Sequence, residues 1–349
     1  MATVGIIANP VSARDIRRVV SNAGNLSATD RANIVLRLLT GLMAAGVDDV
    51  LIMPEKGGIR AQLGRSIDRM KRSNQRVPTI MYLDMPITST AYDSALAAKM
   101  MKAEGVLAIV VLGGDGTNRV VITHCGNIPI ASLSTGTNNA FPEFREPTIT
   151  GLAVGFAVTG VVPAEFALSF NKRFEVKIKD HREIAIVDVA VVAERFIGAR
   201  AIWKVDNFRD LFVTFGEPTG VGMSSIVGLL EPVDRYEPIG RYVQLIPKDI
   251  ASRFLTAPIV PGMIEPVGYR EVKTIEPGVI YRPSISAGSI ALDGEREMTF
   301  DEGEDVSIRL QLDAFRTVNV SDCMNYVAQH NLLSSTHKAQ EAMKNKNLV

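Results

Sequence analysis

A carboxylate set among glycines follows an apolar run in this sequence. The stretch AIVVLGGDGTNRVV, residues 108–121, passes from five apolar residues into GGDGT at 113–117. Glycines allow unusual backbone angles and lack the Cβ that would keep a phosphate away from the amides. A helix expected to begin near Asn118 would point its N-terminal amides at the same anion. The alternative is an ordinary strand-to-helix turn in which Asp115 caps the helix.

Other turns would meet this one at the same edge of a sheet. STGTNNAFP at 134–142 follows the next apolar run, and ANPVS at 8–12 follows the first. Ligands of open α/β sheets bind beyond the carboxyl ends of the strands, so three such turns predict a phosphate-binding site. ALDGERE at 291–297 adds acids beside a glycine late in the chain.

The apolar patterning that must position these turns changes near residue 150. Before it, short continuous apolar runs such as 3–8 and 106–112 alternate with helical stretches, which is typical of a doubly wound parallel sheet. After it, segments such as RFEVKIKD alternate charged with apolar residues, as half-buried strands do. The sequence therefore predicts an α/β domain, then a β-rich domain, then a terminal helix.

Composition narrows the classes of partner. The 349 residues carry 38 basic and 38 acidic side chains, so no net field draws the chain to nucleic acid or to an anionic membrane. No run approaches the roughly 18 apolar residues of a membrane span. The cysteines, Cys125 and Cys323, lie far apart, which fits a reducing compartment. We expect a cytoplasmic homo-oligomer, a dimer or tetramer, that acts on small-molecule nucleotides.

The motifs together resemble those of the NAD kinase and diacylglycerol kinase superfamily. The strand–GGDGT–helix unit, the Asn-Pro turn, the GTNN turn and the late DGE carry this resemblance. Their form is most similar to the ATP-NAD kinase-like AcoX family of acetoin catabolism. The resemblance implies a Rossmann-like nucleotide-binding domain at 1–148 and a β-sandwich-type acceptor domain at 149–315. It also implies a terminal helix, within 316–349, that packs back on the first domain.

The resemblance implies a role for each motif as well. Asp115 would orient or deprotonate an acceptor hydroxyl, with ATP as phosphoryl donor. Mg²⁺ would be held mainly by the nucleotide phosphates, with Asp293 as a candidate ligand. The residues expected to bind the nucleotide are Asn9, Ser12, Gly113, Gly114, Gly116, Thr117, Asn118, Gly136, Thr137, Asn138, Asn139, Asp293 and Glu295.

The acceptor side departs from the family pattern. Where NAD kinases carry an Asn-Glu pair, this chain has Val187 and Asp188, so the acid is kept and the amide is lost. EPTGVGMSSIVG at 217–228 only faintly echoes their TPTGSTAY motif, and it adds Ser224 and Ser225 as expected acceptor contacts. We expect phosphoryl transfer to the 2′-hydroxyl of NAD. The alternatives are a lipid, nucleoside or small polyol acceptor, or a non-catalytic nucleotide-binding regulatory protein.

Overall fold

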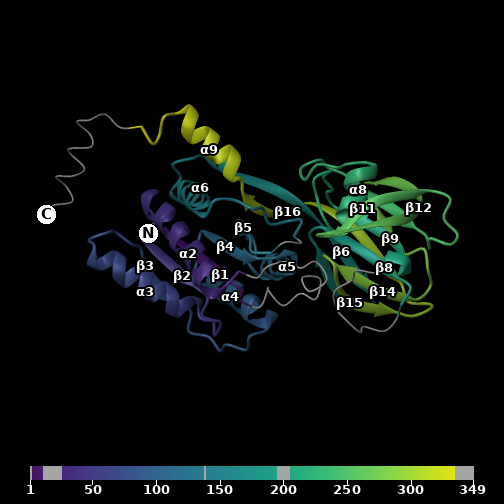
Figure 1. Cartoon of the computed structure of the whole chain (residues 1–349), viewed down its shortest axis with the longest axis horizontal. Helices are drawn as coiled ribbons and strands as arrows, with labels where there is room; N and C mark the ends of the chain where they lie inside the picture. Colours follow the sequence, from purple (N-terminus) through teal and green to yellow (C-terminus); the bar gives the residue numbers. More distant parts are fainter. Residues whose placement is uncertain (1, 11–25, 137–138, 195–204, 335–349) are drawn as a thin grey trace.

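The predicted parallel sheet forms the first half of the molecule (Figure 1). The computed structural model describes residues 2–10, 26–136, 139–194 and 205–334. The strands are β1 (Thr3–Ala8), β2 (Asp49–Ile52), β3 (Thr79–Tyr82), β4 (Ala108–Gly113) and β5 (Ile130–Ser134), in the spatial order β3-β2-β1-β4-β5. Every neighbouring pair among them is parallel. The strand order reverses between β1 and β4, which is where ligands bind in such sheets.

Helices cover both faces of this sheet, and for that reason β4 is a continuous apolar run with every residue buried. One face packs against α2 (Ala28–Ala44), α3 (Ile59–Arg72) and α6 (Pro147–Thr159). The other face packs against α4 (Ala91–Ala103) and α5 (Asp115–His124). The short α7 (Ala164–Ala167) joins the α2 side of the core. Although most of α6 and all of α7 fall in the range assigned to the β-rich domain, they cover the parallel sheet, and the boundary at residue 148 stays a prediction.

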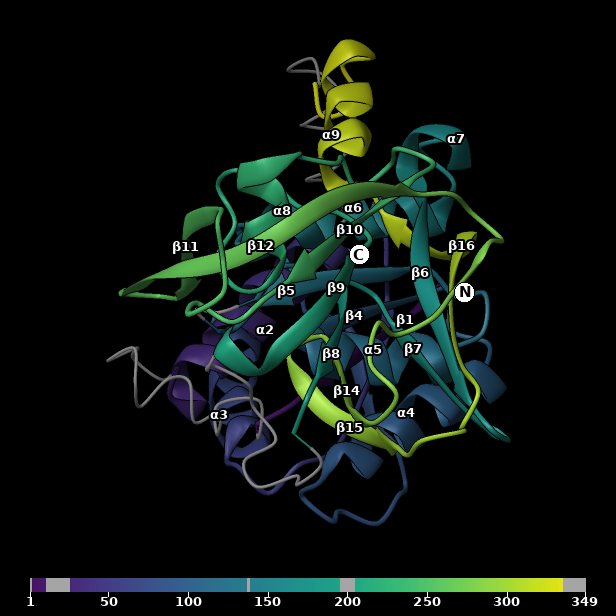
Figure 2. The ribbon, with the colours of Figure 1, turned by 90° about the vertical axis from the view of Figure 1, so that its right-hand side faces the viewer.

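A second, antiparallel sheet forms the other half. Its strands are β8 (Asp188–Val192), β9 (Phe208–Val213), β10 (Gly240–Leu245), β11 (Phe254–Val260), β12 (Met263–Ile275), β14 (Gly288–Leu292) and β15 (Glu295–Phe300), in the order β11-β12-β10-β9-β8-β14-β15. A 3₁₀ turn (Val205–Asn207) precedes β9, and α8 (Ser224–Leu230) packs on the face of this sheet. Figure 2 views the molecule from this end.

The first sheet continues into the second half and makes the sandwich. Beyond β5 come β16 (Val306–Val318), β6 (Leu168–Ile178) and β7 (His181–Ala185), and β13 (Ile280–Tyr281) pairs with β16. Side chains of β6, β16, β8 and β14 share one apolar core, so the predicted β-sandwich is confirmed.

The end of the described chain returns to the parallel half. Strand β16 reaches β5 through the Thr317–Ile130 pair, and α9 (Val320–Gln329) then packs against α6 and α7. Val320, Cys323 and Val327 belong to the core that α2 and α6 also line. The predicted return of a terminal helix is thus confirmed. Within the described ranges, no helix has both the length and the apolar character needed to cross a bilayer.

Candidate functional site

The Asn-Pro turn after β1 and the GGDGT turn after β4 meet where the strand order reverses. Asn9 follows β1, and its backbone N–H donates to the carbonyl oxygen of Leu112 in β4 at 3.2 Å. Its side-chain Nδ2 donates to Oγ1 of Thr117 at 3.1 Å. The Asn-Pro turn and the GGDGT turn therefore touch, as their positions at neighbouring strand ends predict. Ser12 lies outside the described residues.

The helix after the glycine turn begins earlier than expected. Its first residue is Asp115 rather than Asn118, with Gly114 at the N-cap position. Asn118 is fully buried, and its Nδ2 donates to the Gly114 carbonyl at 3.0 Å while its Oδ1 accepts from Oγ of Ser132 at 2.6 Å. Asn118 thus fastens α5 to β5. Gly114, Asp115 and Gly116 remain partly exposed at the helix N-terminus.

Unusual backbone angles do not explain these glycines, which corrects the expectation from sequence, and two of the three are needed for space. None of the three has a positive φ, and Gly114 has φ of −92°. A Cβ on Gly114 would lie 2.7 Å from Oδ1 of Asn139, and one on Gly113 would lie 2.7 Å from Cβ of Thr117. At Gly116 the nearest atom would be a carboxylate oxygen of Glu295, at 3.5 Å, which is ordinary contact.

Asp115 joins the glycine turn to the turn after β5. Its Oδ2 accepts from the backbone N–H of Ala140 at 3.0 Å, and its Oδ1 accepts from that of Phe141 at 2.8 Å. The N-cap position of α5 is occupied by Gly114, so Asp115 is not the N-cap residue that the alternative interpretation expects. The carboxylate is instead held in one orientation at a partly exposed helix N-terminus.

The turn after β5 is itself tied down by Asn139. Nδ2 of Asn139 donates to Oγ of Ser134 at 2.9 Å, and that hydroxyl donates to the carbonyl of Gly136 at 3.0 Å. Thr137 and Asn138 lie outside the described residues. Asn139 therefore contacts the glycine turn on one side and its own strand end on the other.

The DGE segment is the tight turn of a hairpin. Asp293 and Gly294 have φ of 52° and 80°, the pattern of a two-residue type I′ turn between β14 and β15. Oδ1 of Asp293 accepts from the backbone amides of Ile186, Val187 and Asp188 at 2.8–3.2 Å. The hairpin thereby fixes the start of β8, where the acceptor acid is expected.

Arg119 connects this hairpin to the glycine turn, and the sequence analysis missed it. Its Nε lies 3.4 Å from Oδ2 of Asp293, its Nη2 lies 2.7 Å from a carboxylate oxygen of Glu297, and its Nη1 lies 3.9 Å from Glu183. Burial raises the pKa of Asp293 to about 7, against the opposing effect of the Arg119 charge. One feature of the sequence could have indicated Arg119. It follows Asp115 by four residues, so the two side chains lie on the same face of the expected helix.

The surroundings of Asp293 do not fit a Mg²⁺ ligand. Three backbone amides already occupy Oδ1, and Oδ2 accepts from the Ile186 amide and faces the Arg119 cation. A divalent ion there would displace these donors and lie against a positive charge. Across the described ranges, no three acidic, His or Cys side chains come together as a metal site.

The expected acceptor residues are not gathered in one place. Asp188 begins β8 beside the DGE hairpin and is 5% exposed. Ser224 and Ser225 are buried in α8, and Oγ of Ser225 donates to the carbonyl of Gly222 at 2.7 Å. Figures 1 and 2 both show α8 well away from β14 and β15 on the antiparallel sheet. The two serines remain predictions as substrate contacts, and the structure gives them a packing role.

Two family models and known proteins match this chain. A model of the ATP-NAD kinase N-terminal domain matches residues 4–157. A model of the Acetoin catabolism protein X C-terminal domain matches residues 172–313. Among solved structures, a diacylglycerol kinase from Bacillus anthracis (strain Sterne) is similar, with 11% identity, a TM-score of 0.44, and coverage of 91% of this chain and 96% of that one.

The chain is thus an NAD kinase-like protein. It is 47% identical over 337 residues to the Acetoin catabolism protein X of Cupriavidus necator, which covers 95% of this chain and 94% of that protein. The chain therefore belongs to the acetoin catabolism protein X family.

Proposed function

We propose that this chain transfers a phosphoryl group from ATP to an alcohol acceptor, with the 2′-hydroxyl of NAD as the leading acceptor. The observation that carries this proposal is the position of Asp115. Its carboxylate is oriented by two amides of a second turn, at the N-terminus of a helix, where the parallel strand order reverses. Phosphoryl transfer depends mainly on positioning and charge stabilisation, and such a site offers both.

The helix N-terminus supports the donor half of the proposal. Gly114, Asp115 and Gly116 are partly exposed there, and the first amides of a helix favour a phosphate. When bound, Mg²⁺ would offset the negative charge of the phosphates beside Asp115. Asp115 would then accept a hydrogen bond from the acceptor hydroxyl and so direct it toward the γ-phosphate.

The choice of acceptor rests on the family and on Asp188. The N-terminal half matches the ATP-NAD kinase domain model, and Asp188, at the buried start of β8, is the acid that would accept hydrogen bonds from the ribose hydroxyls. The name of the Cupriavidus relative refers to acetoin catabolism, so acetoin, itself an alcohol, belongs among the acceptors to test.

We also propose a homo-oligomeric state, which light scattering measures directly.

The test is ADP release by the purified full chain with ATP and Mg²⁺. NAD, a nucleoside, acetoin and diacylglycerol vesicles are supplied separately, and Asp115→Asn is the control. Acceptor-dependent ADP release that Asp115→Asn abolishes supports the kinase, and NADP formation identifies NAD as acceptor. ATP binding in a thermal-shift assay without ADP release on any acceptor would favour the non-catalytic regulatory reading.

A further inference from the structure

An arginine of the antiparallel half reaches the turn that holds Asp115. Nη2 of Arg235 donates to the carbonyl oxygen of Phe141 at 3.0 Å and lies 3.4 Å from that of Ala140. The Ala140 carbonyl and the Phe141 amide are the two ends of one peptide unit, and that amide donates to Asp115 at 2.8 Å. One peptide unit thus stands between the Arg235 guanidinium and the Asp115 carboxylate.

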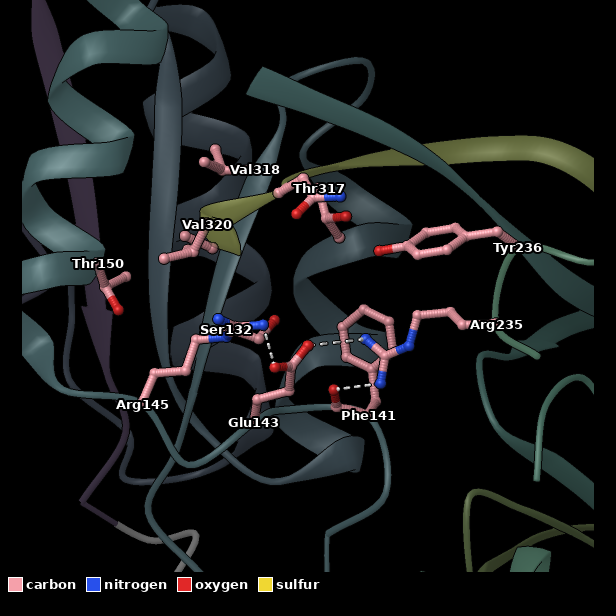
Figure 3. Close-up of a pocket in the computed structure, with 12 residues that line it drawn as sticks. Ser132, Phe141, Glu143, Arg145, Thr150, Arg235, Tyr236, Thr317, Val318 and Val320 are labelled. Carbon is pink, nitrogen blue, oxygen red and sulfur yellow. Dashed lines mark hydrogen bonds and ion pairs between the residues drawn. The ribbon is translucent and has the colours of Figure 1, made fainter. Parts of the chain in front are cut away.

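The guanidinium is held firmly in this position. Its carbon lies 4.9 Å from the ring centroid of Phe141 and 4.4 Å from that of Phe215, which are cation–π distances. Nη1 lies 4.0 Å from a carboxylate oxygen of Glu143, and the side chain is 14% exposed. Figure 3 shows Arg235 beside Phe141, with Glu143 between Arg235 and Arg145 at the wall of a cavity of about 40 Å³.

The loop that presents Arg235 is itself anchored by a buried lysine. Nζ of Lys172, in β6, donates to the carbonyls of Asp234, Glu237 and Ile239 at 2.9, 2.6 and 2.6 Å. All three donors of the ammonium group are therefore used on one loop. Because Lys172 is 5% exposed, these bonds are shielded from water and hold residues 234–239 against the sandwich.

We propose that Arg235 is a positioning residue for Asp115, acting through the Ala140–Phe141 peptide. A cation on the carbonyl end of a peptide polarises its N–H, which strengthens the hydrogen bond that the N–H donates. Arg235 thereby couples the antiparallel half of the chain to the orientation of the proposed catalytic carboxylate. Only the kinetic consequence of this coupling rests on the proposed function.

Arg145→Met is the matched control for Arg235→Met. Arg145 also pairs with Glu143 and lines the same cavity, but in the described ranges its hydrogen bond goes to Oγ of Ser321 at 3.0 Å. Both substitutions remove one guanidinium from the same carboxylate. They differ in whether the removed group touches the peptide that holds Asp115.

Amide hydrogen exchange tests the coupling without any assumption about activity. In Arg235→Met, the Phe141 amide should exchange about 3- to 10-fold faster, as expected for loss of a typical hydrogen bond. Arg145→Met should leave that rate unchanged, and Arg235→Lys, which keeps a charged donor, should fall between. Equal exchange at Phe141 in wild type and Arg235→Met, or equal acceleration in both Met variants, would overturn the proposal. If Arg235→Met does not fold, Arg235→Lys against Arg145→Lys gives the same comparison.

Kinetics then separates this proposal from the proposed function. With a working acceptor, Arg235→Met should lower kcat by about 10²-fold, the usual effect of a misplaced group, with the KM for ATP within about twofold. In an Asp115→Asn background the same substitution should change kcat little, because its target is gone. Faster exchange at Phe141 in a chain that phosphorylates nothing would reject the kinase and keep the positioning role.

Discussion

The Nε atom of Arg119 lies 3.4 Å from the buried Oδ2 of Asp293, and this contact joins the helix of the glycine turn to the hairpin that fixes β8. Both side chains are nearly inaccessible to water, with exposed fractions of 8% and 0%. A charge buried at this depth is costly unless it is paired. The pair therefore ties the stability of the fold to the geometry between the proposed donor and acceptor sides.

Removing one member of this pair should be strongly destabilising. Arg119→Met leaves the Asp293 and Glu297 carboxylates without their cation, and we expect a loss of about 3–5 kcal/mol in the free energy of unfolding. Adding Asp293→Asn should restore part of that loss, because the unpaired acid is removed. Urea unfolding of the single and the double variant measures both changes in the free energy of unfolding. Additive losses in the double variant would show that the two side chains are not coupled.

The same pair predicts a pH dependence of stability. Burial raises the pKa of Asp293 from an ordinary value near 4 to about 7 in the folded chain. Because the folded state then binds more protons than the unfolded state between those values, this group's contribution to stability is present below pH 4 and is lost as the pH rises to 7. The slope is at most about 1.4 kcal/mol per pH unit.

Asp293→Asn should flatten this decline. The measurement is urea unfolding at several pH values between 5 and 8, and the difference between wild type and variant isolates Asp293 from other titrating groups. A difference that does not change with pH would show that Asp293 keeps one protonation state over this range.

Gly114 offers a test of the space requirement at the glycine turn. Gly114→Ala places a methyl group 2.7 Å from Oδ1 of Asn139, so the Asn139 side chain must shift, and we expect weaker ATP binding. Gly64→Ala is the control, because its Cβ would meet nothing within 4 Å and α3 should gain about 0.5–1 kcal/mol. Thermal unfolding and ATP titration of both variants report the outcome. Unchanged ATP affinity in a folded Gly114→Ala would separate this turn from the nucleotide.

Much of the fold follows from local patterns in the sequence. The fully buried β4 reads as a continuous apolar run, and the two neighbouring turns are recognised because Gly, Asn and Thr have local backbone roles. The return of the chain to the parallel sheet is harder to predict from local patterns. Strand β16 meets β5 at a single pair, Thr317 with Ile130, and no periodicity specifies a partner at that separation.

The site was predictable as a set of turns but not as a network. Sequence reasoning placed Asp115 beside the turn after β5 and gave the glycines a backbone role, whereas the structure shows that neighbouring side chains fill the space around two of them. Arg119 and Arg235 were missed because the residues next to an arginine in the sequence do not reveal which distant residue it contacts. Both reach residues distant in the chain, Asp293 and Phe141, and only the fold brings these together.

Asp115→Asn tests the proposed chemistry directly. Turnover should fall by roughly two to four decades, the usual contribution of a group that directs proton transfer, while nucleotide affinity is kept. An Asn side chain also turns an NH₂ group toward one of the two amides, from Ala140 or Phe141, so one hydrogen bond is lost and stability should fall by about 1–3 kcal/mol. Steady-state kinetics beside thermal unfolding checks both effects. Turnover within threefold of wild type would leave Asp115 with a structural role only.

Substitution of Asp188 tests whether this carboxylate contacts the acceptor or stabilises the fold. It is 5% exposed at the start of β8, and its backbone exchanges hydrogen bonds with Asp293. If that carboxylate holds ribose hydroxyls, Asp188→Ala stays folded, keeps its ATP affinity and loses most affinity or turnover with NAD. If the carboxylate serves the fold, the variant loses a few kcal/mol of stability and the surviving enzyme keeps its substrate constants.

Asp210→Ala is the matched control for this last prediction. Asp210 lies in the neighbouring strand β9, is fully buried, and accepts from the Tyr242 hydroxyl and the Ser284 amide, each at 2.8 Å. Its loss should destabilise the fold without changing the NAD constants, because both of its partners belong to the antiparallel half. NAD titration and thermal unfolding of the two variants therefore give opposite patterns if Asp188 binds the acceptor. The same pattern in both would assign Asp188 to the fold and return the choice of acceptor to the ADP-release assay.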